Sequence, residues 1–374
     1  MRKARQRFET LDSLRGICAL LVCLYHFKAV GPLTENGLVE ASWVFVDFFF
    51  VLSGFVIAHS YSGRLDAGMP LLTFAGLRFM RLYPLHIAML LLFLLAETAG
   101  SFVFPGTMQR EPFSGPMAIE AFGLNLLLLH SFGIQEGLSW NHPSWSIAVE
   151  FWTYLLFALL ITTVSRLTLL FTVCAVVASA AGLFYVTDRG INVTWDFGMI
   201  RCIYGFGLGV IGHQLWQRIG TPLDHFGFTR RSMLEISWIA ILLLSILLFS
   251  AGRISIVLPP LFLITILLFS GDGGLVSQAL RRPAALFLGS ISYAIYMVHT
   301  FIQARFEDGV RLLASMGGPS LLTPTNKGLA LVGSNALNGT IVTLLMLSLV
   351  IVASALAYRW IEQPGIRLGR KLIN

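Results

Sequence analysis

Residues 11–30 read LDSLRGICALLVCLYHFKAV, and this stretch decides how the rest of the chain is interpreted. It is long and apolar enough for a membrane span, since crossing about 30 Å of hydrocarbon takes about 20 helical residues. It nevertheless carries Asp12, Arg15 and His26. Ionisable groups are costly inside a bilayer and usually face a cavity or a partner there. The stretch therefore indicates a membrane helix that contributes to a buried polar site.

The composition of the whole chain agrees with this interpretation. The 374 residues are 56% hydrophobic and only 12% charged, whereas soluble domains contain about 25% charged residues. Apolar runs recur along the sequence, and no polar block is long enough for a separate soluble domain. Because these runs are continuous rather than alternating, they favour helices over a barrel. We predict an all-α integral membrane protein with a single transmembrane domain, residues 1–374.

The spacing of the apolar runs predicts about ten transmembrane helices. The segment 117–133 is ambiguous, because its apolar part is short enough for a re-entrant or interfacial helix. The ten expected spans lie at about 11–30, 42–60, 82–99, 144–164, 167–187, 198–217, 233–251, 254–271, 285–304 and 338–358.

The basic residues favour ten spans with both termini in the cytoplasm. That topology places 17 Lys and Arg residues in cytoplasmic segments, among them Arg2, Lys3, Arg5 and Arg7, and six outside. If 117–133 also crossed, the numbers would become 12 and 11, which loses the positive-inside bias. The net charge of +7 is therefore interpreted as a topology signal, and no nucleic-acid partner is expected.

The four cysteines lie within apolar runs and lack metal-ligand spacing, so we expect buried small side chains, no disulfide and no metal site. They are Cys18, Cys23, Cys174 and Cys202.

Three arginines and one histidine have spacings that suggest a functional role. Arg15 and His26 are eleven residues apart, so they share one helical face with a rise of about 16 Å between them. Arg78 and Arg81, in RFMRLYP, are neighbours on a helical surface, and paired guanidiniums suit phosphate recognition. The alternatives are a structural hydrogen-bonding role for His26 and a positive-inside flank for Arg78 and Arg81.

Acidic residues are expected nearer the outer side. Asp47, in VDFFFVLSGFVI, has the same expected depth as His26, where a carboxylate could fix the tautomer of an imidazole and raise its basicity. The neighbouring Ser53-Gly54 pair would allow close helix approach. The alternative is that Asp47 lies at the aqueous interface.

A polar stripe opens the fourth span, in PSWSIAVEFWTYLLF. Ser146, Glu150 and Tyr154 follow at intervals of four residues and so share one face. Glu150 is expected in the outer third, either as a functional carboxyl or as a helix-pinning hydrogen-bonding group. For His299, in LGSISYAIYMVHT, an interfacial or packing role is favoured.

These depths separate into two layers, with Arg15, Arg78 and Arg81 at the cytoplasmic side and the imidazole and carboxylates towards the outer side. A phosphate-bearing donor that enters from the cytoplasm and delivers its reactive end to a deep base would fit this arrangement. The two long outer loops, about 100–143 and 305–337, are further candidates for function.

Six stretches in this order resemble the signature of the acyltransferase-3 family, polytopic bacterial membrane O-acyltransferases of cell-envelope sugars and related acceptors. The family's arginine–ten residues–histidine motif matches Arg15 and His26, and its RxxR motif matches Arg78 and Arg81. Its tryptophan–serine–glutamate motif matches Trp145, Ser146 and Glu150. The stretches are LDSLRG with LYHF, FFFVLSGFVI, RFMRLYP, PSWSIAVEFWTYLLF, LGSISYAIYMVHT and YRWIEQP.

The resemblance implies that His26 is the catalytic histidine and that the three arginines engage acyl-coenzyme A. Acyl-coenzyme A, by default acetyl-coenzyme A, is then a co-substrate, with no permanently bound cofactor. We hypothesise that Asp47 and Glu150 assist catalysis, while other residues bind the acceptor or support the site. These supporting residues are Trp145, Ser146, Trp152, Tyr154 and His299.

The expected acceptor is a hydroxyl of a carbohydrate or lipid-linked glycan, and the expected location is the bacterial inner membrane. The soluble esterase-like domain that some family members append is not expected here. A competing class is a transporter or flippase of a lipid-linked glycan, which buried charges and long outer loops would also suit. That class does not readily explain the co-facial Arg15 and His26 or the paired arginines.

Overall fold

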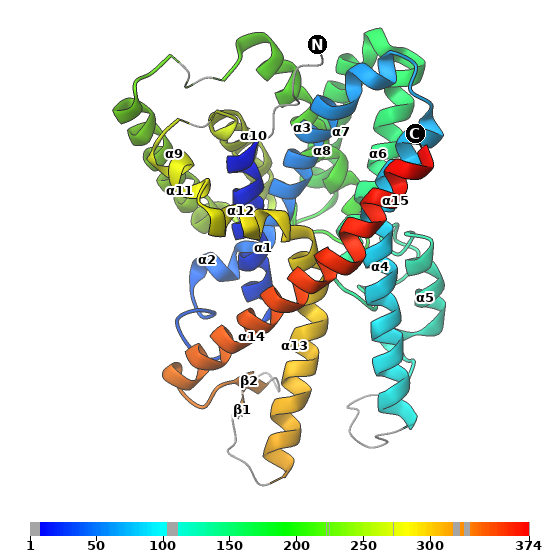
Figure 1. The fold of residues 1–374 in the computed structure, drawn as a ribbon, viewed down its shortest axis with the longest axis vertical. Helices are drawn as coiled ribbons and strands as arrows, with labels where there is room; N and C mark the ends of the chain where they lie inside the picture. Colours follow the sequence, from blue (N-terminus) through cyan, green and yellow to red (C-terminus); the bar gives the residue numbers. More distant parts are fainter. Residues whose placement is uncertain are drawn as a thin grey trace.

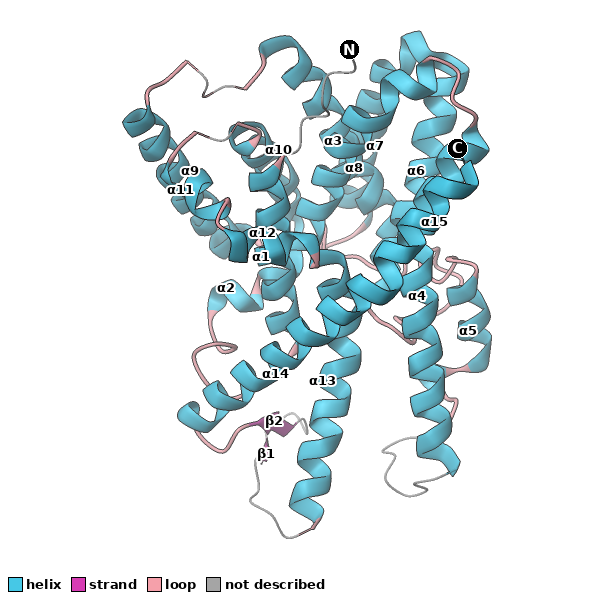
Figure 2. Cartoon of the chain, viewed as in Figure 1, coloured by secondary structure: helices cyan, strands magenta, loops and turns pink. Residues whose placement is uncertain are grey.

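The computed structural model describes residues 8–102, 111–221, 223, 225–271, 273–316, 322–324 and 330–373, and these are nearly all helical (Figures 1 and 2). The α-helices are α1 (Glu9–His26), α2 (Gly37–Glu40), α3 (Phe45–Asp66), α4 (Leu71–Phe102), α5 (Ile119–Leu126), α6 (Ser144–Val164), α7 (Thr168–Val186), α8 (Gly198–Ile219), α9 (Phe228–Phe249), α10 (Leu258–Phe269), α11 (Leu275–Leu280), α12 (Pro283–Ser290), α13 (Ser292–Ser315), α14 (Ala336–Ala357) and α15 (Gln363–Ile373). The short elements are η1 (Ser42–Val44), η2 (Gly115–Met117), η3 (Ser165–Leu167), η4 (Arg253–Val257), η5 (Tyr358–Glu362), β1 (Leu322–Pro324) and β2 (Ala330–Val332).

Each predicted span coincides with helix in the structure, and two of them differ most from the prediction. α4 begins at Leu71, eleven residues before the predicted start, so Arg78 and Arg81 lie inside a long helix. The span predicted at 285–304 is divided at Ile291 into α12 and α13, which are bent by 69°. The first difference concerns a helix end and the second a break inside a span, and hydropathy alone carries little information about either.

By length and composition, five continuous helical stretches of the described chain could cross a membrane, or six if the bent pair counts as one. These properties and the apolar composition identify an all-α membrane protein. The number of crossings and the side of the termini stay predictions. The stretches are Ser42–Asp66, Leu71–Phe102, Ser144–Val186, Phe228–Phe249 and Ala336–Leu372, and the bent pair is Pro283–Ser290 with Ser292–Leu313.

The ambiguous segment 117–133 contains only the eight-residue helix α5. Eight helical residues extend about 12 Å, well short of the hydrocarbon core, so α5 alone does not cross. Figure 1 shows it beside α4.

Glycines allow backbones to touch at two helix crossings. A Cβ atom on Gly54 of α3 would lie 2.0 Å from the Phe206 carbonyl oxygen of α8, and one on Gly209 would lie 2.0 Å from the Val51 carbonyl oxygen. The close approach predicted at Ser53-Gly54 is therefore confirmed. Where α1 crosses α12, a Cβ on Gly16 would lie 2.5 Å from the Leu288 backbone.

The chain end packs on α4. After α14 the helix loosens into the π-turn η5, and α15 continues across α4 (Figure 1). A Cβ on Gly365 would meet Pro84 at 2.8 Å and the Met80 carbonyl oxygen at 3.0 Å, so only glycine permits this contact. This packing brings the buried Glu362 to the arginine-bearing part of α4.

Strand β2 forms backbone hydrogen bonds with the segment that follows α1. The Val332 amide donates to the Lys28 carbonyl at 2.9 Å, and the Val30 amide donates to the Val332 carbonyl at 2.9 Å. The region between α13 and α14 is thereby joined to the backbone directly after His26.

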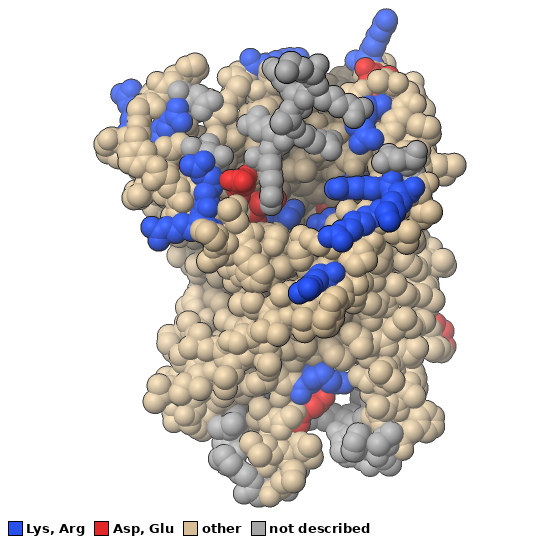
Figure 3. Space-filling view, in the orientation of Figure 1, with Lys and Arg blue, Asp and Glu red and all other residues tan. Residues whose placement is uncertain are grey.

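Basic side chains gather at one end of the molecule. Figure 3 shows most of the visible Lys and Arg on the half where Figure 1 places both termini. The predicted basic residues Arg2, Lys3, Arg5 and Arg7 lie outside the described residues. Of the cysteines, three are buried as predicted, but Cys174 is exposed on α7.

Candidate active site

The three arginines predicted to bind a donor line one cavity of about 200 Å³. Arg15 reaches it from α1, and Arg78 and Arg81 reach it from α4. Its remaining lining comes from α3, α6 and α13, with Leu82 added by α4. Those residues are Val46, Phe49, Phe50, Leu52, Ser53, Val56, Ile57, Leu82, Ser146, Ile147, Glu150, Tyr154, Ser292, Tyr293 and Tyr296.

Arg15 is held at the break between α12 and α13. Its Nε donates to Ser292 Oγ at 2.7 Å and its Nη2 donates to the Gly289 carbonyl at 3.2 Å. That carbonyl belongs to the last turn of α12, where helix carbonyls lack intrahelical donors. Arg15 therefore stabilises the bend and also presents its guanidinium to the cavity.

Arg78 and Arg81 have partners of different charge. Arg78 donates to the Tyr61 hydroxyl at 2.6 Å and lies 4.7 Å from the centre of that ring. Arg81 forms an ion pair with Glu362, whose side chain is fully buried. Each guanidinium has five N–H donors, and these contacts use only some of them. Both arginines can therefore donate further hydrogen bonds into the cavity.

The polar stripe of α6 faces the same cavity. Glu150 Oε1 accepts hydrogen bonds from Ser53 and from the Tyr154 hydroxyl, the latter at 2.5 Å, and Ser146 also lines the cavity. We expected Glu150 in the outer layer with His26, but the structure places it with the arginines. The reason is that α6 starts among buried residues, since Asn141 and Ser144 are fully buried, so its second turn already lies deep.

His26 pairs with His299 across α1 and α13. Their ring centres are 5.0 Å apart, and His299 Nε2 lies 3.3 Å from His26 Nδ1. His26 does not line the arginine cavity, but Tyr296 does, and its ring centre is 6.1 Å from that of His299. Tyr296 therefore borders both the cavity and the histidine pair. For His299 we favoured an interfacial or packing role, but its side chain contacts the predicted base.

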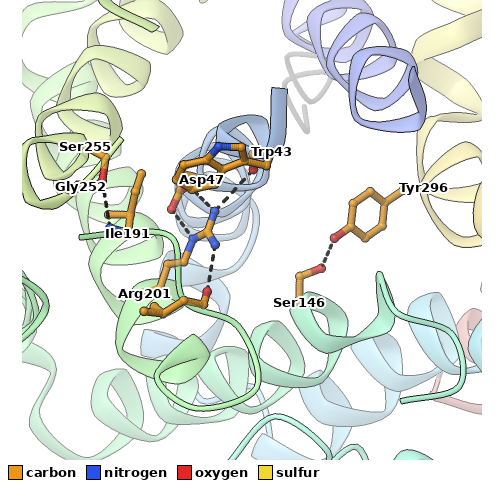
Figure 4. Close-up of polar contacts among 9 residues, drawn as sticks. Trp43, Asp47, Ser146, Ile191, Arg201, Gly252, Ser255 and Tyr296 are labelled. Carbon is orange, nitrogen blue, oxygen red and sulfur yellow. Dashed lines mark hydrogen bonds and ion pairs between the residues drawn. The ribbon is translucent and has the colours of Figure 1, made fainter. Parts of the chain in front are cut away.

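Asp47 has a different partner from the one predicted. Both carboxylate oxygens accept from Arg201 of α8, Oδ1 from Nε at 3.0 Å and Oδ2 from Nη2 at 2.6 Å (Figure 4). No contact joins Asp47 to His26 in the described part of the chain. The predicted pairing of Asp47 with His26 is thus replaced by a pairing with a buried arginine, and a catalytic role for Asp47 stays untested. Full burial also excludes the alternative of an aqueous interface.

The side chains of Trp145 and Ser146 contact different residues. The Arg201 guanidinium lies 5.2 Å from the Trp145 ring, and only 5% of Trp145 is exposed. Ser146 Oγ lies 2.8 Å from the Tyr296 hydroxyl (Figure 4). Trp145 thus packs against the buried ion pair, whereas Ser146 joins the cavity to the tyrosine next to His299.

Trp152 faces the segment before α6 and does not line the cavity. Its Nε1 donates to the Leu128 carbonyl at 3.0 Å. Nearby, His130 Nε2 lies 3.0 Å from Ser144 Oγ in the first turn of α6. Burial, with a smaller contribution from neighbouring His86, lowers the pKa of His130 to about 3, so this imidazole is neutral. These contacts fix the start of α6.

The segment SWNHPSW also binds α13 beside His299. Asn141 Nδ2 donates to the Met297 carbonyl at 3.0 Å, and Thr300 Oγ1 donates to Asn141 Oδ1 at 2.8 Å. The end of the predicted outer loop therefore lies against the histidine-bearing turn of α13, and its functional role stays a prediction.

Sequence reasoning missed Arg201, Tyr296 and Glu362. Arg201 carried a usable signal, because it is an arginine within an apolar run and such residues need a partner. Glu362 lies in the YRWIEQP stretch, whose acidic residue had no assigned role. Tyr296 had no distinguishing signal, since tyrosines are ordinary constituents of membrane helices.

Comparisons with known proteins show what this chain is similar to. A family model described as "Acyltransferase domain" matches residues 8–359. The chain is 28% identical to "Acyltransferase MdmB" of Streptomyces mycarofaciens over 98% of this chain and 93% of that protein. It is 40% identical to "Protein 2 in picA locus" of Rhizobium radiobacter over 23% of this chain and 44% of that protein. No solved structure matches.

Proposed function

The chain belongs to the acyltransferase-3 family, and on this premise we propose that it moves an acyl group, acetyl by default, from acyl-coenzyme A to an acceptor hydroxyl. The proposed acceptor is a carbohydrate of the cell envelope, such as lipopolysaccharide, exopolysaccharide or another glycan. The proposed location is the inner membrane of a bacterium. Family membership favours this enzyme over a glycan transporter or flippase.

One observation carries the proposal, namely the convergence of Arg15, Arg78 and Arg81 on a single cavity. They come from two helices, and their only carboxylate neighbour in the lining is Glu150. Glu362 pairs with Arg81 and Asp12 lies 3.7 Å from Arg15, whereas the hydrogen-bond partner of Arg78 is the neutral Tyr61 hydroxyl. Guanidiniums bind phosphate oxygens through paired charge-assisted hydrogen bonds, so the phosphates of coenzyme A are suitable occupants.

The helical rise on α1 supports a connection between donor and base. Arg15 and His26 are separated by about 16 Å along one face of the helix. An extended donor arm with its phosphates at Arg15 can therefore bring its thioester towards His26. Tyr296, which borders both the cavity and His299, lies along this route.

The proposed reaction has one proton acceptor and one leaving group. His26 takes the proton from the acceptor hydroxyl, and the oxygen attacks the thioester carbonyl carbon. The carbon–sulfur bond breaks, and the coenzyme A thiolate leaves and takes up a proton. The products are an O-acyl ester and free coenzyme A. Positioned acid–base catalysis of this kind contributes about 10²–10⁴-fold to a rate.

The first test measures donor binding and transfer separately. Acetyl-coenzyme A should raise the melting temperature of the purified protein, because a ligand that binds only the folded state stabilises it. Membranes containing the protein should transfer label from acetyl-coenzyme A into envelope glycans, detected by mass spectrometry. Membranes without the protein provide the blank.

Two variants sharpen this test. His26→Ala should keep the stabilisation by acetyl-coenzyme A and lose transfer, whereas exchange of the exposed Arg166 for alanine should change neither. Full transfer by a folded His26→Ala protein would contradict the assigned base. The absence of both stabilisation and transfer in the unmodified protein would contradict the proposed function.

A further inference from the structure

We propose that His299 is a positioning residue, which fixes His26 in the tautomer whose Nε2 is the base and supports the charge that His26 acquires. This inference rests on the proposed function, because it concerns the same proton transfer. It gives His299 the orienting role that sequence reasoning assigned to Asp47. The evidence is the hydrogen-bond geometry of the two imidazoles and the way α13 is held against α1.

The surroundings of His26 determine which nitrogen carries its proton. Nδ1 lies 2.9 Å from the Val22 carbonyl oxygen, and a carbonyl oxygen can only accept. The proton of neutral His26 therefore resides on Nδ1, which leaves a lone pair on Nε2. Nε2 makes no hydrogen bond to any described residue, so it is available to a substrate hydroxyl.

The same argument applies to His299. Its Nδ1 lies 3.1 Å from the Ile295 carbonyl oxygen, which places the proton on Nδ1 and the lone pair on Nε2. That lone pair lies 3.3 Å from His26 Nδ1. The His26 Nδ1–H group is therefore shared between Val22 and His299. When His26 takes up a proton, this contact becomes a charge-assisted hydrogen bond, which is stronger than a neutral one.

Contacts on both sides keep His299 in register with His26. His299 is fully buried. One turn further along α13, Gln303 Nε2 donates to the Cys23 carbonyl of α1 at 2.7 Å. On the other side, Asn141 binds the Met297 carbonyl at 3.0 Å. Because α13 is bonded to α1 and to the outer loop, the His299 ring has little freedom to move away.

Asp47 does not fill this role, since the described residues that contact His26 Nδ1 are Val22 and His299. The two carboxylate oxygens of Asp47 accept hydrogen bonds from Arg201, and both residues are buried. A neutral imidazole also suits this position better than a carboxylate would. A second buried anion would require its own counterion, whereas His299 accepts a hydrogen bond without adding charge.

The test compares two substitutions at His299. His299→Leu removes the acceptor at similar volume, whereas His299→Gln retains an amide oxygen that can accept from His26 Nδ1–H. We measure the maximal rate of label transfer from acetyl-coenzyme A into membrane glycans, and the acetyl-coenzyme A concentration at half of that rate. His299→Leu should lower the maximal rate on the order of 10- to 100-fold, a share of what a positioned base contributes.

Two further results are expected for the same variants. His299→Gln should recover most of the maximal rate, and both variants should keep the half-saturating concentration, since the arginine cavity is untouched. His213→Leu is the matched control. It also exchanges a buried histidine, 2% exposed, for leucine, but it lies outside the site and should leave the maximal rate unchanged.

The inference is overturned if folded His299→Leu transfers at the full rate, or if leucine and glutamine lower the rate equally. A melting temperature measured with and without acetyl-coenzyme A verifies that each variant is folded and binds donor. Failure of this inference differs from failure of the proposed function. In the first case His26→Ala is inactive while His299→Leu is normal, and in the second His26→Ala itself retains transfer.

Discussion

Buried ionisable side chains in this protein differ in the partners that hold them. Asp47 is neutralised by Arg201, which donates a hydrogen bond to each of its carboxylate oxygens. Glu362 neutralises Arg81 at the edge of the cavity. Arg78 has the neutral Tyr61 hydroxyl as its partner, so its charge is available to an anionic ligand. The residue type alone suggests chemistry, but the partner decides whether the group is structural or free to react.

Removal of Asp47 should destabilise the protein and should not specifically abolish catalysis. Asp47→Ala leaves Arg201 as an uncompensated charge with 2% of its side chain exposed. Breaking a buried pair on one side costs about 3–5 kcal/mol. Unfolding in detergent, followed by the melting temperature or by denaturant titration, measures this loss.

The double variant Asp47→Ala with Arg201→Met is the control for this prediction. Removing both charges should restore most of the stability, because apolar replacement of a buried pair is often neutral. It should also restore acyl transfer. A folded double variant without any transfer would return Asp47 to the candidate catalytic residues.

Arg78→Ala should weaken donor binding with little effect on the fold. Its hydrogen-bond partner is a neutral hydroxyl, so no buried anion is left unpaired. A hydrogen bond to a charged group contributes about 1.5–3 kcal/mol, and 1.4 kcal/mol is tenfold in affinity. The half-saturating acetyl-coenzyme A concentration should therefore rise about tenfold or more. An unchanged value would exclude Arg78 from the donor site.

At the scale of elements, close helix crossings position the site. α3 and α8 approach until backbone meets backbone at Gly54 and Gly209. This approach brings Arg201 of α8 to Asp47 of α3. At the bend between α12 and α13, the buried Gly289 carbonyl accepts hydrogen bonds from Arg15 and from Ser292. Each crossing thus determines both a packing contact and a polar contact.

Gly54→Ala should destabilise the α3–α8 pair. The new Cβ would lie 2.0 Å from the Phe206 carbonyl oxygen, and that backbone atom cannot move without displacing α8. Gly63→Ala on the same helix is the matched control, since nothing lies within 4 Å of its Cβ. The control should keep or slightly raise the melting temperature. Equal melting temperatures for the two variants would show that the crossing tolerates a methyl group.

At the scale of the whole molecule, charge is distributed along the long axis. Visible basic side chains concentrate at the end that carries both termini (Figure 3). This distribution agrees with the predicted cytoplasmic location of that end. The histidine pair lies close to the end of the SWNHPSW segment, and strand β2 binds the backbone directly after His26.

Labelling of introduced cysteines should establish this orientation. In a variant without the four native cysteines, Glu136→Cys in the loop before α6 should react with an impermeant maleimide on intact cells. Arg230→Cys, in the first turn of α9, should react only after lysis. Both parent residues are exposed, so access decides the outcome. The opposite pattern would invert the predicted topology.

The sequence by itself determined the membrane class, helix at every predicted span and the shared face of Ser146, Glu150 and Tyr154. These features depend on hydropathy and on helical periodicity, which are local properties. The gathering of Arg15, Arg78 and Arg81 in one cavity agrees with the predicted layer of arginines, although their roles stay predictions.

Only the tertiary structure decided which buried groups are partners. Asp47 and His26 have similar expected depths, but depth fixes position along one axis and leaves the rotation of each helix open. The close crossing of α3 and α8 turns Asp47 towards Arg201, and the packing of α13 on α1 turns His299 towards His26. Pairing depends on helix rotation and crossing, which side-chain packing sets across the whole bundle.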